Sequence, residues 1–516
     1  MRMKNSLLAL GLVITSLTFV LAGCGNSTSS TSSNSTQSSP GKPQHGGAIT
    51  IAYPVDITNF DPLKGTTGND FALLYPVYDT LIKLSAKLKP EPELATSWSM
   101  PNSKTIILNL RKGVTFQDGT PFNAAAVKFN IDRANSPQSL DTELNDVKSV
   151  QIINNYTVEL HLSQPDSSIL LSLGERAGMM VSPTAIKKYG NNYPQHPVGA
   201  GPFEVTKHIP NGEIVYTAYK HYWDKGHPYL HQITVKVIPD ANSEINALMT
   251  GQVDFVPGVA PQMVAALKKK SNIVLSETNS LGFQMLYLDT GKKPFNNKAV
   301  RLAVLYGINR SQLVNAINFG LGVPTSQPFP KGYWAYDKNI NIPYDPQKSK
   351  QLLKTAGLTH VSFTLLTYPI AIWENLANAI KGQLANIGIN VTVQTMEPNA
   401  AVQQFLVNKN YSSLTGNWGG TPDPQMTIDG LFSTTSLYNT GKSMTPKLKS
   451  LLSEVNSTYN QAKLAKLYGQ IDNEAIVKQG FIIPLFTTLN INAMDQRIHG
   501  FTPSLGATMF ANLWVN

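Results

Sequence analysis

The amino-acid sequence predicts an α/β protein with two lobes, and three observations lead to this expectation. About 470 residues follow an N-terminal polar tract, which is more than a single ordinary domain holds. Short alternating strand patterns mix with helix patterns along that whole length, in no strict order. No segment after Pro43 is long and polar enough to act as a flexible linker, so ordered crossovers must join the lobes.

The strand patterns begin at Gly46 with GGAITIAYP. Apolar residues alternate at 158, 160 and 162 in TVELHL and at 233, 235 and 237 in ITVKVIP, which is typical of half-buried strands. TIILNLRKGVTFQDGTPF predicts two strand-like pieces around Asp118-Gly119, a dipeptide typical of hairpin turns. Asp118 could instead be a catalytic acid, but a turn already needs this residue, and we favour the turn.

Helices have clearer boundaries in the sequence. YDPQKSKQLLKTAGL predicts a helix with Asp345 as N-cap, Pro346 in the first turn and Gly357 as the stop. WENLANAIKGQLANIGINVTVQT predicts a helix that leads into a strand, which is half of an α/β unit. Two further helices are expected within residues 445–480, and FIIPLFT then returns as a strand.

The first 23 residues predict a secretory signal peptide. Arg2 and Lys4 give a basic start, Leu7 to Leu21 is almost wholly apolar, and Ala22 and Gly23 are small residues typical of cleavage sites. The apolar run is shorter than the roughly 20 residues that cross a bilayer, and no later stretch matches it. We therefore expect no membrane-spanning helix after processing.

Cys24 is the only cysteine of the 516-residue chain. An unpaired cysteine in an exported protein calls for an explanation, because it cannot close an internal disulfide. LAGC, residues 21–24, resembles the bacterial lipobox, in which the cysteine becomes the first mature residue and carries lipid. The alternative is a cysteine that merely lies near a cleavage site. Residues 24–45 are rich in Ser, Thr and Asn and predict a flexible tether for that anchor.

The charge pattern argues against a nucleic-acid partner. The chain has 42 Lys and Arg against 32 Asp and Glu, a formal net charge of +10. The only basic cluster is KKK at residues 268–270, which is too small for a nucleic-acid surface. We expect a monomer without a nucleic-acid partner.

No catalytic motif stands out. GLGVPT at Gly320 lacks the third glycine of a dinucleotide-binding loop, and GKS at Gly441 lacks the upstream glycine of a phosphate-binding loop. Neither H-E-x-x-H nor G-x-S-x-G occurs. The histidines at 221, 227 and 231 form one loose group, but Gly and Pro interrupt their segment, which is typical of a surface turn. We therefore predict no enzymatic activity, no cofactor and no metal site.

Several segments, in order, resemble the family 5 extracellular solute-binding proteins, which are the receptors of oligopeptide, dipeptide, nickel and related ABC importers. Residues 93–134 resemble the signature region of the family. GAGPFEV resembles its G-T-G-P segment, with Ala200 in place of Thr, and PFNNKAVRLAVLYGINR resembles its V-R-x-A helix, with Asn309 in place of Asp. INALMTGQVDF, YDPQKSKQLLKTAGL, LANIGINVTV and NWGGTPDPQ complete the match, which runs from about Gly46 to the C-terminus.

The resemblance implies a two-lobed, periplasmic-binding-protein-like fold of type II, in the large class with an extra subdomain. Two crossovers, near Glu277 to Leu281 and near Gln479 to Ile483, would form the hinge. A ligand in the cleft between the lobes would favour the closed form, which ABC permease subunits would then recognise. The implied boundaries are lobe I at 46–60, 188–278 and 483–516, the extra subdomain at 61–187, and lobe II at 279–482.

The resemblance also implies ligand-binding residues in lobe II. In peptide-binding relatives an Asp three residues after the tryptophan pairs with the α-amino group of the peptide, and Thr421 stands at that place here. A hydroxyl cannot supply that ion pair, so we expect recognition without it, although Asp423 could substitute or could serve only the loop. Trp418 is expected to form a flat wall of the cleft, with a core tryptophan as the alternative, and Asn417 and Gly419 flank it.

Arg176, in LGERAGMMVSP, stands where the nickel-binding branch carries an arginine that faces the carboxylates of the ligand. The alternative is an arginine satisfied within the subdomain. His360 is the only histidine of lobe II, which argues against imidazole ligation of a metal from that wall. We expect a peptide or peptide-like solute bound by a lipid-anchored receptor on the extracellular face of the membrane. The alternatives are a receptor for a metal chelate or other organic solute, a secreted hydrolase, and a chaperone-like or sensory lipoprotein.

Overall fold

The computed structural model describes residues 41–65 and 67–516. The expected signal peptide, Cys24 and most of the tether lie outside the described residues, so those expectations stay predictions. No helix in the two described ranges is long and apolar enough to cross a membrane. We use the names lobe I, lobe II and extra subdomain for the residue ranges given above.

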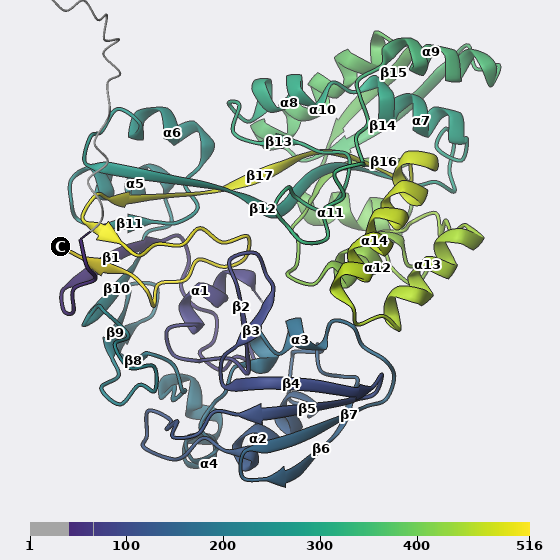
Figure 1. Ribbon diagram of the computed structural model, residues 1–516. Coiled ribbons are helices and arrows are strands. Elements are labelled where there is room, and N and C mark those ends of the chain that lie inside the picture. Colours follow the sequence, from purple (N-terminus) through teal and green to yellow (C-terminus); the bar gives the residue numbers. More distant parts are fainter. Residues whose placement is uncertain (1–40, 66) are drawn as a thin grey trace, which may run out of the picture. The chain divides into compact units, whose positions relative to one another are not determined.

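One eleven-stranded sheet holds most of the strands outside the extra subdomain (Figure 1). Hydrogen-bonded neighbours follow the order β15-β14-β16-β12-β17-β11-β1-β10-β9-β8, and β13 pairs with β17. The strands are β1 (Ala48–Tyr53), β8 (Phe203–Ile209), β9 (Glu213–Ala218), β10 (Gln232–Val237), β11 (Phe255–Val256), β12 (Ile273–Leu288), β13 (Val323–Pro324), β14 (Val361–Thr367), β15 (Ile389–Thr395), β16 (Ser413–Trp418) and β17 (Ile482–Asp495).

Two long antiparallel strands, β12 and β17, run through the middle of this sheet and belong to both lobes (Figure 1). The end of β17 also pairs with β11 in lobe I, whereas the second half of β12 pairs with β16 in lobe II. Their register shifts twice, between the pairs Asn279↔Leu489 and Phe283↔Thr487 and again between Gln284↔Phe486 and Met285↔Pro484. Such an irregularity disrupts the ladder locally, which makes it the natural place for a bend.

The register shifts lie beside the two connections that the sequence predicts between the lobes. On β12 they fall within 279–285, beside the first expected crossover. On β17 they fall within 484–489, directly after the second crossover expected at 479–483. Strand β17 begins at Ile482 and so includes the end of that expected crossover. Motion about this point stays a prediction.

The extra subdomain has its own four-stranded antiparallel sheet, in the order β4-β5-β7-β6. The alternating residues of TVELHL, Val158, Leu160 and Leu162, are buried as predicted. Helix α2 (Ala124–Ala134) lies against β6 and β7, and Asn123 caps it by accepting hydrogen bonds from two backbone amides. The other strands are β2 (Ile82–Leu84), β3 (Pro90–Pro92), β4 (Ala95–Asn102), β5 (Thr105–Leu110), β6 (Val147–Asn154) and β7 (Thr157–Leu162).

The hairpin expected at Asp118-Gly119 is only partly present. Strand β5 forms, but the second piece is reduced to a single bridge between Thr115 and Pro121. Gly119 has φ +78°, which the turn requires, and Asp118 accepts hydrogen bonds from the Thr120 amide at 3.0 Å and the Ser182 hydroxyl at 2.5 Å. These bonds favour the turn role of Asp118 over a catalytic one.

The predicted helices of lobe II are present. Asp345 caps α9 through a 2.8 Å hydrogen bond from the Lys348 amide, and Gly357 follows the helix with φ +68°. The longer helices of the chain are α5 (Ala241–Met249), α6 (Pro261–Leu267), α7 (Lys298–Gly307), α8 (Arg310–Ile317), α9 (Pro346–Thr355), α10 (Ala371–Ala385), α12 (Pro424–Phe432), α13 (Pro446–Asn456) and α14 (Gln461–Asp472). Shorter pieces are α1 (Phe71–Leu74), α3 (Ile169–Ser172), α4 (Pro183–Tyr189) and α11 (Pro398–Val402), and β18 (Ile498–His499) pairs with β19 (Trp514–Val515).

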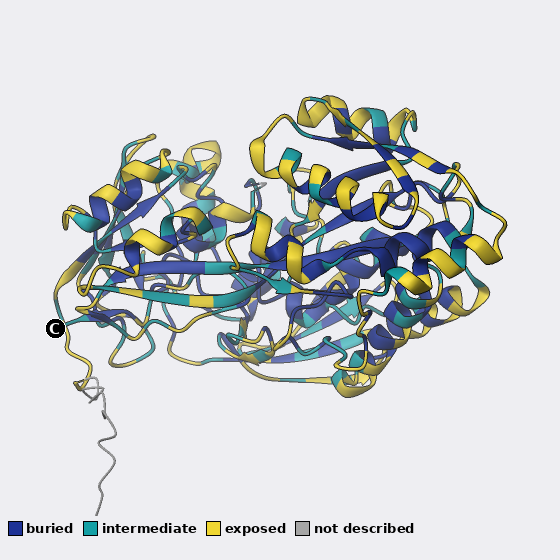
Figure 2. Ribbon diagram, turned by 90° about the horizontal axis from the view of Figure 1, so that it is seen from above, coloured by how far each residue is buried: buried dark blue, intermediate teal, exposed yellow. Residues whose placement is uncertain are grey.

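Separate hydrophobic cores match the division into parts. The largest core belongs mostly to lobe II and also contains Ile483, Leu485, Phe486 and Leu505 of lobe I and Leu88 of the extra subdomain. A second core lies in the extra subdomain and is joined by Ala200 of lobe I. Two smaller cores flank the lobe I part of the sheet. Figure 2 shows the central strands buried and the outward faces of the covering helices exposed, as expected for an α/β fold.

Candidate functional site

The lobe II segment singled out by the sequence is the loop between β16 and α12. The loop packs closely against the first crossover. Gly420 has φ +78°, and a Cβ at this position would collide with Leu281. The Tyr333 hydroxyl donates a 2.6 Å hydrogen bond to the carbonyl of Pro422 and fixes the middle of the loop. The loop is therefore firmly held at the junction of the lobes.

Trp418, the last residue of β16, is half-buried. Its indole Nε1 donates a 3.1 Å hydrogen bond to Thr427 Oγ1, and its ring packs edge-on against Tyr438 with centroids 5.3 Å apart. A Cβ at Gly430 would collide with the indole, so only glycine fits under it. The side chain thus contributes to the packing of lobe II while part of its surface stays open.

The residues beside Trp418 differ in their exposure to solvent and in their hydrogen bonds. Asn417 and Gly419 are exposed. The Thr421 hydroxyl donates a 2.7 Å hydrogen bond to the carbonyl of Asp423 and lies 3.3 Å from Thr427 Oγ1. This hydroxyl is therefore occupied within its own loop.

Asp423 serves the loop and also lines a cavity. It is the N-cap of α12, and its Oδ1 accepts a 2.9 Å hydrogen bond from the Gln425 amide. The residue is only 4% exposed. Among the site residues expected from the sequence, Asp423 alone belongs to the lining of the cavity described next.

A cavity of about 550 Å³ lies between the extra subdomain and lobe II. Two loops of the subdomain form one side, and the start of α12 with the end of α13 forms the other. Five carboxylic acids and no Lys, Arg or His line it, and we call it the acidic cavity. The lining residues are Thr142, Glu143, Asp146, Gln164, Pro165, Asp166, Ser167, Ser168, Ser172, Asp423, Gln425, Met426, Asp429, Ser453, Asn456 and Ser457.

Burial raises the pKa of several acids in and beside this cavity. The pKa of Asp423 rises to about 7, chiefly because burial penalises its charged form. The pKa of Glu143 rises to about 9 through burial and the nearby Glu175, whose own pKa rises to about 8 through burial and Asp423. Arg176 is the positive charge that offsets part of these increases.

Arg176 is buried within the extra subdomain and only 7% exposed. Its Nη2 lies 3.4 Å from Asp70 Oδ2 and donates to the carbonyl of Thr67, and its guanidinium stacks 4.6 Å from the Phe71 ring centroid. It does not line the acidic cavity. These contacts favour the alternative in which the arginine is satisfied inside the subdomain.

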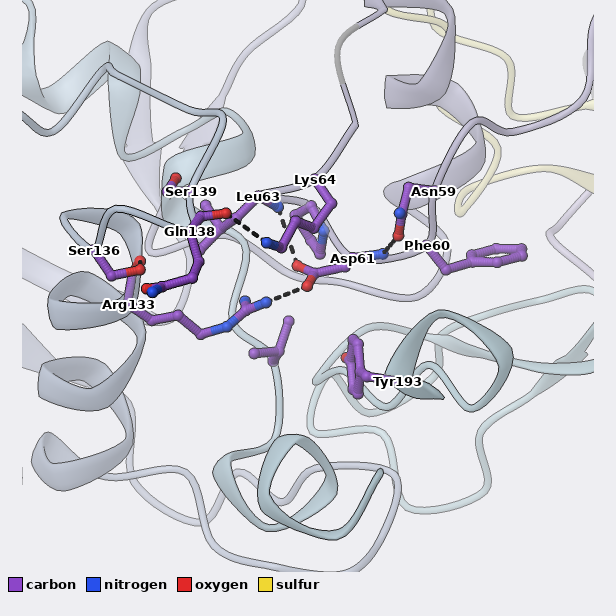
Figure 3. Close-up of polar contacts among 12 residues, drawn as sticks. Asn59, Phe60, Asp61, Leu63, Lys64, Arg133, Ser136, Gln138, Ser139 and Tyr193 are labelled. Atoms are coloured by element: carbon purple, nitrogen blue, oxygen red, sulfur yellow. Dashed lines mark hydrogen bonds and ion pairs between the residues drawn. The ribbon is translucent and has the colours of Figure 1, made fainter. Parts of the chain in front are cut away.

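The segment 59–64, whose Pro62 carbonyl accepts a 3.5 Å hydrogen bond from Arg176 Nη1, is itself fixed by polar contacts (Figure 3). The Asp61 carboxylate pairs with Arg133 of α2 and accepts a 3.2 Å hydrogen bond from the Leu63 amide. Lys64 Nζ donates a 2.5 Å hydrogen bond to the carbonyl of Gln138 (Figure 3). The electrostatic surroundings of Arg176 are thus built into the subdomain.

A second cavity, of about 380 Å³, is lined by residues 75–93 of the extra subdomain and by lobe I, including its C-terminal segment 500–512. Asp79 lies in its wall and accepts hydrogen bonds from Trp223 Nε1 at 2.6 Å and the Tyr222 hydroxyl at 3.2 Å. Its lining mixes charges of both signs, including Lys83 and Glu93, which lie 3.9 Å apart. No residue of lobe II lines this cavity. A ligand bound here would therefore not draw the two lobes together.

Sequence reasoning missed four acids of the acidic cavity, which are Glu143, Asp146, Asp166 and Asp429. They come from segments almost 300 residues apart in the chain, and no local spacing links them. Within residues 41–65 and 67–516, no group of three or more His, Cys, Asp or Glu side chains is arranged to hold a metal ion.

A two-lobed α/β fold with two connecting strands and a cavity between its parts is that of a solute-binding receptor. The chain belongs to the bacterial extracellular solute-binding proteins, family 5, whose model matches residues 89–439. It is therefore a substrate-binding protein of the ABC importer type, from a family of receptors and not of enzymes. The predicted family and fold class are confirmed.

Named relatives agree with this placement. The glutathione-binding protein GsiB of Escherichia coli and of Shigella flexneri is 29% identical over 469 residues, which is 88% of this chain and 91% of GsiB. The structure of HbpA2 from Haemophilus parasuis has a TM-score of 0.83 at 22% identity and covers 91% of this chain and 100% of its own. The periplasmic binding protein DppA from Helicobacter pylori, in complex with the peptide STSA, has a TM-score of 0.73 at 26% identity and covers 92% and 99%.

Proposed function

We propose that this receptor captures a short peptide or peptide-like solute between the 417–432 segment of lobe II and the extra subdomain, and delivers it to a membrane permease. The acidic cavity carries the proposal, because residues of both parts line it. Its volume of about 550 Å³ lies in the range usual for small-molecule sites. The names of the relatives, a glutathione-binding protein and a binding protein in complex with a peptide, point to the same ligand class.

Closure about β12 and β17 is the proposed mechanism. Two register shifts on β12, between Asn279 and Phe283 and between Gln284 and Met285, interrupt its ladder with β17. Ligand that touches both sides of the cavity binds more tightly when the two sides are close, and it therefore favours the closed form. Tyr459 of lobe II supplies a contact for that form, since its hydroxyl accepts a 2.9 Å hydrogen bond from the Asp166 amide and donates one of 2.6 Å to the carbonyl of Ser103.

Membrane attachment through Cys24 completes the proposal. A lipid-anchored receptor with a flexible tether at residues 24–45 stays near its permease and keeps the reach to dock on it. We propose that the mature chain is a monomer on the extracellular face of the membrane and that it has no enzymatic activity. Assays on chromogenic esters and peptides test the last point directly.

Titration calorimetry tests the ligand class. Glutathione, di- and tripeptides, single amino acids and metal chelates are titrated into the ligand-free protein, and small-angle scattering follows the radius of gyration. The proposal expects micromolar or tighter binding of a peptide-like compound together with a smaller radius of gyration. Binding of chelates alone would contradict the peptide assignment, and an unchanged radius at saturation would contradict closure.

A further inference from the structure

We propose that the acidic cavity is a subsite for a positively charged side chain of the ligand, of the lysine or arginine type, so that the receptor selects basic peptides. This inference rests on the proposed function, because it assigns a part of the same ligand site. It goes beyond recognition of a peptide's α-amino group, since it requires a second positive charge on the ligand.

The acids that line the acidic cavity lack counter-ions. Within the described ranges, none of the five acids of the cavity forms an ion pair. This is unexpected in a chain with a net charge of +10, where ten more basic than acidic side chains are available. Carboxylates taken out of water without a partner are costly, and a bound cation repays that cost.

Two of these acids also have acceptor sites that no hydrogen bond uses. The nine-tenths-buried carboxylate of Asp423 accepts hydrogen bonds only from backbone amides at the start of α12, which leaves acceptor sites unused. Glu143 Oε2 is also buried without a partner, and a bound cation would favour the charged form that burial now disfavours by raising its pKa. A carboxylate has about four acceptor sites, whereas an ammonium group carries three N–H donors and a guanidinium five. The unused acceptors therefore match the donors of a basic side chain.

The other acids are held in place by neutral donors that leave their charge uncompensated. Asp166 Oδ1 accepts hydrogen bonds of 2.9 Å and 2.5 Å from the amide and hydroxyl of Ser168. Asp429 Oδ2 accepts a 2.7 Å hydrogen bond from the Gln425 side-chain amide. Preorganised carboxylates of this kind bind a cation without first giving up a salt bridge.

The surroundings reinforce the negative potential. The C-terminal end of α13, at Asn456 and Ser457, lines the cavity with the negative end of its helix dipole. The positive end of α12 is capped by Asp423 itself. Arg176, whose charge acts on Glu143, already pairs with Asp70, and Asp141 and Glu175 are further acids that act on Glu143.

An organic cation fits these groups better than a metal ion. No three acids in the described ranges are arranged to hold a metal. The five carboxylates are instead spread over a volume of about 550 Å³, which accommodates the reach of a lysine or arginine side chain.

The experiment compares two tripeptides, Ala-Lys-Ala and Ala-norleucine-Ala, by calorimetry at pH 8 on the mature protein. Both carry a free α-amino group, and they differ only in the side-chain charge. We expect the lysine peptide to bind at least about tenfold more tightly. The variants Asp166→Asn and Asp429→Asn should remove this preference, so that each variant binds the two tripeptides with equal affinity. Asp240→Asn, an exposed helix cap elsewhere, is the matched control and should keep the preference.

The outcomes separate the two proposals. Equal affinity for both tripeptides would overturn the cationic subsite and leave the peptide receptor intact. Binding of 1,5-diaminopentane without any peptide binding, lost in Asp429→Asn, would support the subsite and overturn the peptide assignment. Tight binding of calcium or magnesium chloride alone would overturn the organic-cation assignment.

Discussion

The guanidinium of Arg176 lies 3.4 Å from the carboxylate of Asp70, and both side chains are buried in the extra subdomain. Asp70 also accepts hydrogen bonds from the amide and hydroxyl of Thr58. Arg176, which the resemblance suggested as a partner for ligand carboxylates, is therefore paired with Asp70 inside the protein.

Arg176→Ala should lower stability more than it alters ligand selectivity. Removal of the arginine leaves Asp70, which is fully buried, without its positive partner. Breaking a buried pair in this way costs about 3 to 5 kcal/mol. Urea denaturation measures this loss. Arg497→Ala, which breaks an exposed pair, is the control and should cost at most about 1 kcal/mol. Unchanged stability together with a selective loss of binding to carboxylate ligands would restore the fork role.

Trp418→Ala should weaken both the protein and its complex. The indole packs on Gly430 and Tyr438, so truncation leaves a void in lobe II, and loss of its open face removes roughly 1 to 3 kcal/mol of apolar contact with ligand. Thermal unfolding with and without ligand separates the two effects. Trp418→Phe should recover most of the stability while losing only the hydrogen bond to Thr427. A normal affinity in Trp418→Ala would exclude this side chain from the ligand site.

Asp472 should make the protein less stable as the pH rises. Both of its carboxylate oxygens are buried without a hydrogen-bond partner, and its pKa is raised well above the usual value, first by burial and then by Asp337. Because the folded-state pKa is higher than the unfolded one, the stability contribution is complete below about pH 4 and is lost as the pH rises through the folded pKa.

Asp472→Asn tests this sign. The neutral variant should be more stable than the wild type at pH 8 by about 1 to 3 kcal/mol, and the difference should shrink towards pH 4. Urea denaturation at several pH values provides the measurement. Asp240→Asn, at an exposed helix cap, should not be stabilised at pH 8, because hydrogen bonds from Ser243 lower the pKa of Asp240. A difference that stays constant with pH would mean that the pKa of Asp472 is the same in the folded and the unfolded protein, which would contradict the prediction.

Cys24→Ser should release the protein from the membrane or leave it unprocessed. The reason is that serine cannot carry the thioether-linked lipid that a lipobox cysteine receives. Cell fractionation and the electrophoretic mobility of the protein show the outcome. Retention in the membrane fraction with unchanged mobility would contradict acylation at this position.

Local features of the fold follow from the sequence, because they depend on neighbours in the chain. The Asp345 cap and Gly357 stop of α9 involve residues only a few positions apart, and both are present. The alternation in TVELHL likewise fixes which side chains of β7 face the core. The family resemblance extended this to the fold class, since it rests on ordered segments along almost the whole chain.

Only the tertiary structure decided the partners of the charged groups and the register of the long strands. Whether Arg176 faces ligand or Asp70 depends on a loop more than 100 residues away, whose path no local pattern records. The register shift at Asn279 to Phe283 depends on the pairing of β12 with β17, which follows 200 residues later. The acidic cavity joins Glu143 and Asp166 to Asp423 and Asp429, so it exists only once the two segments meet in space. Folding removes these acids from water, and no sequence pattern reveals this. The free-energy cost of that desolvation is the physical reason to expect a cationic ligand.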